Sequence, residues 1–378
     1  MIASTQSVYT PPSTPSSPIP ARTEVVVLGA GLTGLSIAQR LRAIGVDTVV
    51  VDARPKVGAG MATRGTGVAS IQLLDPPFRL IEAVGLDRAT EIVRFSAEGV
   101  AEWGCNLRQT GVAYATKGSQ ESGEVARNLA AMEQLGVAAR PWSSETATGL
   151  SAGWIQPDGG TIDLQTEVAR LARGLTICTE CRVVDVGEEG FDASVRLLNG
   201  SRIRCDLVVM TGGAHVTPWA ADKFYTVRHQ ALATEPVSRI ADAPIYIQYG
   251  YTGVRQLPDG AVMISGCRWA TPHLEVGETD DTVVNKKVHH SLKGFLHRHW
   301  PELTDAAISH QWSGIMTFSC DGLPIIGPLP GRPRVIACGG FGAHSASLSL
   351  RAARAVVEGI ETGRPASMPD CFSPQRFG

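Results

Sequence analysis

A glycine-rich stretch near the N-terminus constrains the fold of this chain more than any other feature. Residues 24–38 read EVVVLGAGLTGLSIA, in which the β-branched apolar run Val25 to Leu28 stops at a glycine. Such a run predicts a buried parallel strand, and Gly29, Gly31 and Gly34 have the spacing of a dinucleotide-binding turn. Gly29 permits a tight turn, Gly31 lets backbone N–H groups approach a pyrophosphate, and Gly34 lets the next helix pack closely. The stretch therefore predicts a strand, a turn and a helix that hold a dinucleotide.

The residues after this turn complete the motif. A helix is predicted over residues 32–43, with its positive N-terminal end toward the phosphates, and a second strand over residues 48–51. Asp52 follows this strand, at the place where an acidic side chain accepts hydrogen bonds from a ribose diol. The alternative is a glycine-rich turn with a solvated aspartate, which the order strand, turn, helix, strand and acid disfavours.

Length and composition bound the class of protein. A chain of 378 residues with 43% hydrophobic and 19% charged residues is typical of a globular enzyme of two domains. The formal net charge of −2 gives no basic surplus for nucleic acid, and no apolar run is long enough to span a membrane. Residues 1–22 are rich in Ser, Thr and Pro and predict a flexible tail, with a short organellar targeting peptide as the alternative. The eight cysteines lack metal-ligand spacing, so we expect no metal site and a reducing, cytoplasmic location.

A second glycine-rich segment follows Asp52. Residues 58–67 read GAGMATRGTG, and a helix is predicted over residues 70–84. Four glycines and small neighbours indicate a backbone that passes very close to a bound group. A nicotinamide dehydrogenase does not need such a segment, whereas the ribityl chain and ring of a flavin do. The alternative is a mobile surface loop.

Two more units of strand and glycine turn occur later in the chain. Residues 205–214 read CDLVVMTGGA, a buried strand that ends in glycines. A strand is predicted over residues 334–338, and GGFGAHS after it opens a helix over residues 345–359. The positive N-terminus of that helix suits the N1–C2=O edge of a reduced, anionic flavin. The alternative is a helix that only packs on the sheet.

The middle of the chain divides into a helical and a strand-rich part. Residues 85–145 are predicted to be mainly helical, and strands over residues 246–251 and 261–269 predict a half-exposed antiparallel sheet. Such a sheet is a platform for substrate. The histidine-rich residues 286–300 have apolar positions at helical spacing, which predicts a surface helix rather than a metal site.

Together these motifs resemble the D-amino acid oxidase, glycine oxidase and sarcosine oxidase family of FAD-dependent oxidoreductases. The resemblance is carried, from residue 24 to about residue 360, by VLGAGLTG with Asp52, GAGMATRGTG, VVMTGGAH, YTVRHQ, the box from Trp312-Ser-Gly to Asp321-Gly-Leu-Pro-Ile-Ile-Gly, and GGFGAHS. It implies an α/β fold in which a Rossmann-type FAD-binding domain is joined to a substrate domain with a mixed or antiparallel sheet. The expected FAD-binding domain is discontinuous, over residues 23–75, 146–224 and 306–378, and the substrate domain covers residues 76–145 and 225–305.

The resemblance also implies an activity. We expect oxidation of a C–N bond by hydride transfer to flavin N5, which converts an amine or amino acid into an imine. In an oxidase, O2 then accepts the electrons and H2O2 is released. The first alternative is a flavin-dependent dehydrogenase of a 2-hydroxy acid or other alcohol with an acceptor other than oxygen. The second is a non-catalytic nucleotide-binding or electron-relay protein, and the oligomeric state is not predicted.

One departure from the family pattern concerns the substrate. Glycine oxidase-like members carry an arginine that pairs with the substrate carboxylate, and a gapless match places Met316 there. Methionine cannot replace a bidentate guanidinium. Either the substrate has no carboxylate at this place, which suits a bulky or secondary amine, or Arg64, Arg255 or Arg268 binds the carboxylate instead.

Two further departures concern the cofactor. Sarcosine oxidase-like members attach the flavin through a cysteine near the place of Gly314, so the resemblance implies non-covalent FAD here. The lysine linked to oxygen activation in some members has Met263 near its place, which leaves oxidase and dehydrogenase open.

The candidate residues fall into two sets. Tyr251, His344 and Arg64 are the candidates for catalysis. Tyr251 matches a pocket tyrosine of the family, and the alternative is a strand aromatic packed against its neighbours. His344 lies in the last glycine turn, and the alternative is a cap or packing role. The residues predicted to bind the cofactor are Gly29, Ala30, Gly31, Leu32, Thr33, Gly34, Asp52, Ala53, Arg54, Gly60, Met61, Ala62, Thr63, Arg64, Gly65, Val183, Thr211, Gly212, Gly213, Gly314, Gly340, Phe341, Gly342, Ala343, His344 and Ser345.

Overall fold

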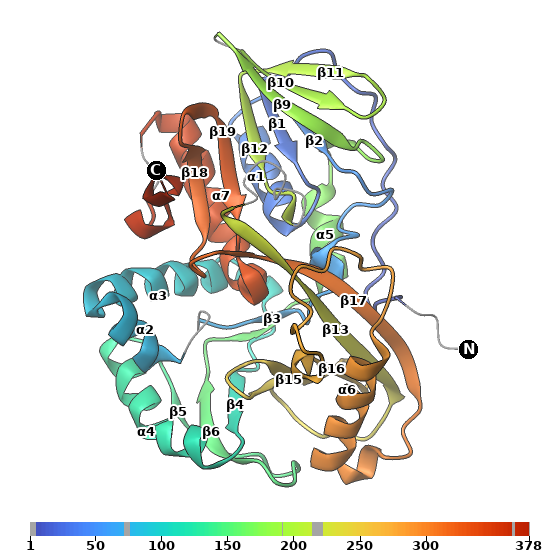
Figure 1. Cartoon of the computed structure of the whole chain (residues 1–378), viewed down its shortest axis with the longest axis vertical. Coiled ribbons are helices and arrows are strands. Elements are labelled where there is room, and N and C mark those ends of the chain that lie inside the picture. The colour runs from blue at the N-terminus through green and yellow to red at the C-terminus, as the bar shows by residue number, and fades with distance from the viewer. Residues whose placement is uncertain (1–4, 72–75, 191, 214–221, 365–366, 378) are drawn as a thin grey trace. The chain divides into compact units, whose positions relative to one another are not determined.

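The chain divides into two compact units, and each is assembled from separate stretches of sequence (Figure 1). The computed structural model describes residues 5–71, 76–190, 192–213, 222–364 and 367–377. Unit 1 comprises Met1–Val8, Arg64–Ile162 and Val227–Ile315, and unit 2 comprises Tyr9–Thr63, Asp163–Thr226 and Met316–Gly378. A discontinuous division of this kind is what the sequence predicts. The boundaries differ, however, because residues 64–75, 146–162 and 306–315 belong to unit 1 instead of the unit that carries the first glycine turn.

Unit 2 is built on a six-stranded sheet with the order β18-β19-β12-β1-β2-β8. All of its strands run parallel except β18, which pairs antiparallel with β19. Val25–Leu28 is buried throughout, as expected for a parallel strand covered on both faces. The strands are β1 (Val25–Leu28), β2 (Thr48–Val51), β8 (Thr176–Cys178), β12 (Leu207–Met210), β18 (Ile325–Leu329) and β19 (Arg332–Gly339).

Both faces of this sheet are covered. On one face α1 (Leu32–Ala43) packs against α7 (Ser345–Thr362) and α5 (Leu164–Ala172). On the other face lies an antiparallel sheet of β9 (Val183–Glu189), β10 (Asp192–Leu197) and β11 (Arg202–Cys205), which shares one apolar cluster with alternate residues of β1 and β2 (Figure 1). The expected helix over residues 32–43 and strand over residues 48–51 are confirmed to the residue.

Residues of the stretch 9–22 contact the rest of unit 2, and the predicted flexibility of residues 1–22 stays a prediction. Ser17 N–H donates to the carbonyl oxygen of Ile177 at 2.7 Å. Arg22 forms ion pairs with Asp192 and Asp206 at 3.2 and 2.7 Å. Residues 1–4 lie outside the described part of the chain. Composition did not indicate these contacts, because a Ser- and Pro-rich stretch can pair its backbone with an exposed sheet edge without apolar residues.

Unit 1 contains an eight-stranded sheet with the order β17-β13-β16-β15-β14-β4-β6-β5, and a two-stranded sheet of β3 and β7. The expected strand over residues 246–251 is shorter, because Gln248 and Tyr249 have positive φ angles and form a turn after Ile247. The strands are β3 (Val68–Ala69), β4 (Val112–Thr116), β5 (Arg140–Trp142), β6 (Ser151–Gln156), β7 (Gly160–Thr161), β13 (Phe224–Pro236), β14 (Ile245–Ile247), β15 (Thr252–Gln256), β16 (Ala261–Ser265) and β17 (Ile308–Ser319).

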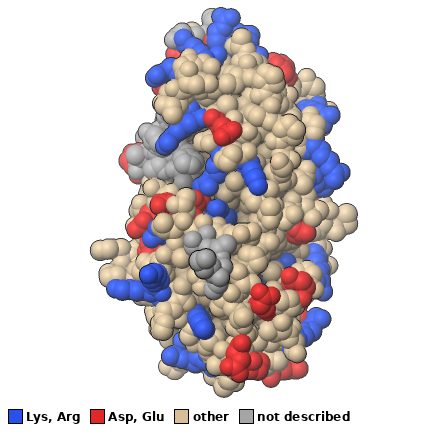
Figure 2. All heavy atoms as spheres, turned by 90° about the vertical axis from the view of Figure 1, so that its right-hand side faces the viewer, with Lys and Arg blue, Asp and Glu red and all other residues tan. Residues whose placement is uncertain are grey.

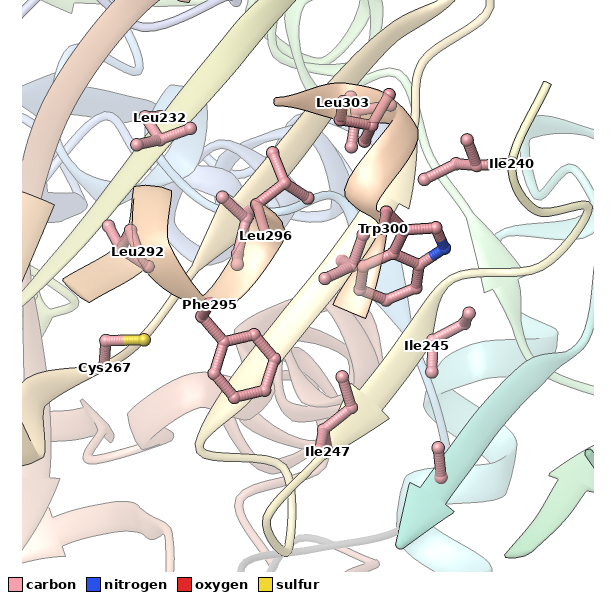
Figure 3. Packing of buried hydrophobic residues seen from close by; sticks show 14 of the residues in the cluster. Leu232, Ile240, Ile245, Ile247, Cys267, Leu292, Phe295, Leu296, Trp300 and Leu303 are labelled. Carbon is pink, nitrogen blue, oxygen red and sulfur yellow. The ribbon is translucent and has the colours of Figure 1, made fainter. Parts of the chain in front are cut away.

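Helix α6 (Lys286–His299) covers one face of this sheet. Leu292, Phe295 and Leu296 of the helix pack against Ile245 and Ile247 of β14 (Figure 3). The histidine-rich stretch is thus a helix with an apolar inner face, as its spacing predicts. His289 and His299 are nevertheless buried, which the expectation of a surface helix did not include.

The helices of the other part of unit 1 are α2 (Pro77–Val84), α3 (Leu86–Ala101) and α4 (Ser119–Gln134). The expected helix over residues 70–84 begins only at Pro77, and residues 72–75 lie outside the described residues. The prediction of mainly helical structure over residues 85–145 missed β4 and β5. Val112–Thr116 is a short run buried on both faces, and such a run does not alternate in polarity.

The described residues contain no helix that is long and apolar enough to cross a membrane. They also contain no group of three or more His, Cys, Asp or Glu side chains placed to hold a metal ion. Basic and acidic side chains are interspersed on the face shown in Figure 2. The short 3₁₀ turns are η1 (Met61–Thr63), η2 (Gly104–Asn106), η4 (Arg268–Ala270), η5 (Pro301–Leu303), η6 (Gly342–His344), η7 (Asp370–Phe372) and η8 (Pro374–Phe377).

Candidate functional site

The first glycine turn of unit 2 is packed as tightly as its sequence predicts. Gly29 has a φ of +111°, and a Cβ there would lie 2.9 Å from the Cα of Gly212. A Cβ on Gly34 would lie 1.9 Å from the carbonyl oxygen of Gly29. Thr211 Oγ1 donates to the carbonyl oxygen of Leu28 at 2.9 Å and joins the ends of β1 and β12. Side chains at Gly29 and Gly34 are therefore excluded by the protein itself.

Gly31 is in the opposite situation. A Cβ built on it meets no atom within 4 Å, so the space in front of this residue is open. Gly31 is the N-cap of α1, whose first turn has no acidic residue and no side-chain cap. The first N–H groups of a helix have no partner within the helix, and here they coincide with open space at the positive end of the helix dipole. These features fit a pyrophosphate.

Asp52 lies at the carboxyl end of β2, and its carboxylate already accepts hydrogen bonds from two backbone N–H groups. Oδ2 accepts from the N–H of Ala30 at 2.7 Å, and Oδ1 accepts from the N–H of Arg54 at 2.8 Å. Because a carboxylate has about four lone-pair sites, the side chain retains capacity for a ribose hydroxyl. Ala53 is exposed and Arg54 half-buried.

The second glycine segment is divided between the two units. In unit 2, Thr63 Oγ1 donates to the carbonyl oxygen of Gly58 at 2.9 Å and closes the loop around η1. Gly60, Met61 and Ala62 are half-buried, with backbone and side-chain area open to a ligand. The remaining residues that the sequence predicts in this segment, Arg64 and Gly65, belong to unit 1.

The third group of cofactor candidates lies at the ends of β12 and β9. The N–H of Gly213 donates to the carbonyl oxygen of Thr211 at 2.8 Å, and Gly213 has a φ of +54°. Val183 starts β9 and is half-buried. Ala214 and His215 of the VVMTGGAH motif lie outside the described residues.

The C-terminal glycine turn packs against aromatic rings of unit 2. A Cβ on Gly342 would lie 2.3 Å from the ring of Phe318, and one on Gly340 would lie 3.1 Å from the ring of Phe224. Phe341 forms a β-bridge with Phe318. These contacts explain why the turn needs glycine at both positions.

This turn presents the start of α7. Helix α7 has no acidic residue in its first turn, and its N-cap residue His344 makes no side-chain cap. Ala343 is exposed, and His344 and Ser345 are half-buried. Burial lowers the pKa of His344 to about 4, so its imidazole is neutral at pH 7. Positive potential at this place therefore comes from the helix N-terminus and not from a histidine cation.

The N-termini of α1 and α7, with the glycine turns that precede them, fit FAD. The residues from Gly29 to Gly34, with Asp52, would hold the nucleotide and pyrophosphate. The turn from Gly340 to Ser345 would face the flavin ring. Each assignment of an individual residue to the cofactor stays a prediction.

The substrate candidates lie mostly in unit 1. Among them, Arg64 forms hydrogen bonds and an ion pair with other residues of the protein. Its Nη1 donates to the carbonyl oxygen of Ser313 at 2.8 Å, and Nε lies 3.7 Å from Asp281 Oδ2. The indole N–H of Trp312 donates back to the carbonyl oxygen of Arg64 at 2.9 Å. These bonds tie the glycine segment to β17, next to Gly314, so Arg64 is poorly suited to bind a substrate carboxylate.

Arg255 on β15 also donates hydrogen bonds to backbone carbonyl oxygens. It is buried, and its Nη1 donates to the carbonyl oxygens of Thr66 and Gly67 at 2.6 and 3.2 Å. Its charge is thereby directed to the end of the glycine segment. Met263, which pairs with Arg255 across β15 and β16, is buried.

Arg268 and Tyr251 form the accessible pair among these candidates. Tyr251 is 57% exposed, and the Arg268 guanidinium lies 5.7 Å from the centre of its ring. Arg268 is half-buried and its Nη1 donates to the carbonyl oxygen of Leu274 at 3.2 Å. The structure thus brings together two residues that the sequence predicts separately.

His229 on β13 is a further residue near this pair that sequence reasoning did not select. Burial, assisted by the charge of Arg268, lowers the pKa of His229 to about 3. Its Nδ1 is buried and has no hydrogen-bond partner among the described residues. His229 is part of the YTVRHQ motif of the sequence. Side chains alternate between the two faces of a strand, but this alternation alone does not tell whether Arg228 or His229 faces a site.

Met316 lies on β17 in unit 2 and is 4% exposed. Its thioether offers no donor for a carboxylate. The replacement of a carboxylate-binding arginine by Met316 stays a prediction.

The comparisons with known proteins agree with this architecture. The family described as DAO, FAD dependent oxidoreductase, matches residues 24–359. The chain therefore belongs to the FAD-dependent oxidoreductase family, and the predicted cofactor, FAD, is confirmed.

Solved structures share the whole fold. L-proline dehydrogenase from P. horikoshii has a TM-score of 0.77 and 19% identity, over 95% of this chain and 98% of that chain. Glycine oxidase from Geobacillus kaustophilus has a TM-score of 0.76 and 17% identity, over 94% and 99%. L-amino acid deaminase from Proteus vulgaris has a TM-score of 0.74 and 17% identity, over 97% and 96%. These likenesses confirm the predicted fold class, a Rossmann-type unit with a mixed or antiparallel substrate sheet.

A curated relative matches only a short segment. The protein named possible lysine-specific histone demethylase 1 of Drosophila melanogaster is 44% identical over 48 residues, which is 12% of this chain and 5% of that protein.

Proposed function

We propose that this protein oxidises the C–N bond of an amine or amino acid and releases an imine, which water then hydrolyses. The substrate loses two electrons and two protons when the C=N bond forms. FAD, when bound, supplies the acceptor for the electron pair. The residues of the chain bind and orient the substrate, exclude water and set the charge around the reacting groups.

The observation that carries this proposal is the accessible pair Tyr251 and Arg268 on the unit 1 sheet. The ring of Tyr251 is 57% exposed and is therefore available to a ligand. A guanidinium beside it recognises a carboxylate. Because Arg268 lies beside this exposed ring, we assign the carboxylate of an amino-acid substrate to Arg268.

The buried Met316 supports a preference for apolar groups at its own position. A thioether packs against alkyl or aromatic groups and gives no hydrogen bond to a carboxylate. This favours a bulky or secondary amine as the substrate.

His344 supports the same reaction as a neutral group. With a pKa near 4, its imidazole neither repels a cationic amine nor adds to the positive end of α7. We assign to it a hydrogen bond that orients the reacting groups, and to the α7 N-terminus the stabilisation of developing negative charge.

We further propose that O2 is the electron acceptor and that H2O2 is released. The absence of a lysine at the position of Met263, which is buried, leaves a dehydrogenase with another acceptor as the competing possibility. The eight free cysteines support function in a reducing compartment such as the cytoplasm.

Anaerobic titration of the purified protein tests the proposal. Loss of the yellow flavin absorbance on addition of an amine or amino acid, but not of the matching 2-hydroxy acid, is the expected result. Bleaching by hydroxy acids alone would overturn the proposal. Readmission of air then separates the acceptors, because an oxidase regains its colour within seconds and accumulates peroxide.

A further inference from the structure

A small cavity in unit 1 lies beneath the turn between β14 and β15. Its volume is about 20 Å³, enough for one water-sized group, and it is open on one side. None of its lining residues is assigned above to the cofactor or the substrate. The lining includes Tyr114, Glu121, Asn128, Trp154, Tyr246 and Tyr249.

Aromatic side chains form the walls. Tyr114 stacks on Trp154 with ring centres 5.1 Å apart and an interplanar angle of 12°, and the ring of Tyr246 follows at 5.6 Å. Burial raises the pKa of both Tyr114 and Tyr246, so these phenols stay neutral. Such walls keep the local dielectric low and strengthen any charge interaction inside the cavity.

Glu121 of α4 is the one ionisable carboxylate among the lining residues. Its side chain is 8% exposed and accepts from the N–H of Lys117. Burial raises the pKa of Glu121. The nearby Glu124 is engaged elsewhere, because Arg79 pairs with it at 2.9 Å and Tyr249 donates to it at 3.0 Å. A carboxylate buried in this way is stabilised by a cation.

Asn128, seven residues or about two helical turns further along α4, lines the same cavity and gives a second and independent indication. It is 1% exposed, and its Nδ2 donates to the carbonyl oxygen of Glu124 at 3.1 Å. Its Oδ1 has no hydrogen-bond partner among the described residues. A buried acceptor without a donor is costly, so a ligand that donates hydrogen bonds would stabilise the cavity. The indole N–H of Trp154 also lacks a described partner, which a bridging water would satisfy instead.

We propose that this cavity binds the protonated amino group of a small primary alkylamine, with Glu121 as the counter-ion and Asn128 Oδ1 as an acceptor. An ammonium group is close to water in size, carries three donors and brings the charge that a water lacks. The alkyl chain leaves through the open side, past the rings of Tyr246 and Tyr249. The residues that form this cavity are different from Tyr251 and Arg268, to which the proposed oxidation assigns the substrate.

The test compares methylammonium with methanol on the full-length, FAD-loaded protein, by tryptophan fluorescence. Wild type should bind methylammonium at least tenfold more tightly than methanol, and Trp154→Phe should abolish the signal that reports this cavity. Glu121→Gln should weaken methylammonium binding at least tenfold. Glu133→Gln, an exposed residue of the same helix, makes the same change of charge away from the cavity and should alter binding less than twofold.

Two results would overturn the proposal. Equal affinities for methylammonium and methanol in wild type would mean that the cavity only holds water. Undiminished methylammonium binding in Glu121→Gln would place the amine elsewhere. In Glu121→Gln the glutamine keeps a carbonyl oxygen that can accept from the N–H of Lys117. The comparison of methylammonium with methanol uses wild type alone, so it does not depend on the folding of any variant.

Discussion

Replacing Gly31 or Gly34 with alanine should separate cofactor binding from stability. At Gly31 the backbone is extended, with φ −88° and ψ −176°, and a Cβ meets nothing within 4 Å. Loss of a glycine N-cap costs about 1 kcal/mol at most, and the lower entropy of the unfolded chain offsets part of this. The free energy of unfolding of the FAD-free protein should therefore change by less than about 1 kcal/mol.

The same substitution should nevertheless weaken FAD binding. The methyl group occupies the open space at the N-terminus of α1, where the N–H groups would meet the pyrophosphate. We expect the dissociation constant for FAD to rise at least tenfold, or about 1.4 kcal/mol. Quenching of flavin fluorescence during titration of the FAD-free protein measures this constant.

Gly34→Ala is the matched control. Its Cβ would lie 1.9 Å from the carbonyl oxygen of Gly29 and 2.6 Å from Thr211 Oγ1, so the backbone itself must shift. We expect the FAD-free protein to lose about 3 kcal/mol or more in urea unfolding. If Gly31→Ala bound FAD as wild type does, or if Gly34→Ala left stability unchanged, the assignment of roles to these glycines would be refuted.

Four further outcomes follow from the structure. Arg268→Met should raise KM for an amino-acid substrate at least tenfold and leave KM for an amine without a carboxylate unchanged in steady-state assays. Glu275→Ala should cost about 3 kcal/mol in chemical unfolding, because the buried Arg228, bonded to Glu275 at 2.6 Å, loses its main counter-ion. Burial lowers the pKa of His289 from 6.5 in the unfolded chain to about 4 in the folded chain. Between these pH values the unfolded chain binds more protons, so the free energy of unfolding falls as the pH drops from 6.5 to 4. In unfolding curves measured across this pH range, His289→Phe should remove up to about 3 kcal/mol of that fall. Acid precipitation should release all the flavin into the supernatant, and Cys320→Ser should bind as much FAD as wild type, whereas colour retained in the pellet would contradict non-covalent binding.

The strand–turn–helix unit at residues 25–51 was predictable to the residue, because its signals are local. A β-branched run, three glycines and an apolar helix face each act within a few positions of the chain. Close packing at Gly29 and Gly34 follows from the same local geometry. The fold class was predicted from the resemblance that these motifs, in their order and spacing, have to the family.

The roles of the arginines could not be predicted in this way. Arg64, Arg255 and Arg268 are equivalent as sequence letters. In the structure Arg64 donates to the carbonyl oxygen of Ser313 and Arg255 is buried, whereas Arg268 lies beside the exposed ring of Tyr251. Such long-range partners have no signature in a single sequence.

The turn after β14 was missed for a related reason. Gln248 and Tyr249 have φ angles of 55° and 56°, a conformation that sequence rules reserve for glycine or asparagine. The Tyr249 hydroxyl, bonded to Glu124 at 3.0 Å, helps to hold it. Tertiary contacts thus override local preference there, and the predicted strand over residues 246–251 ends early.

Anaerobic reduction of the bound flavin by an amine tests directly whether this protein oxidises C–N bonds. We predict that the purified protein is yellow and loses this colour stoichiometrically with an amine or amino acid. A protein that binds FAD but keeps its colour with every amine and amino acid offered would contradict it.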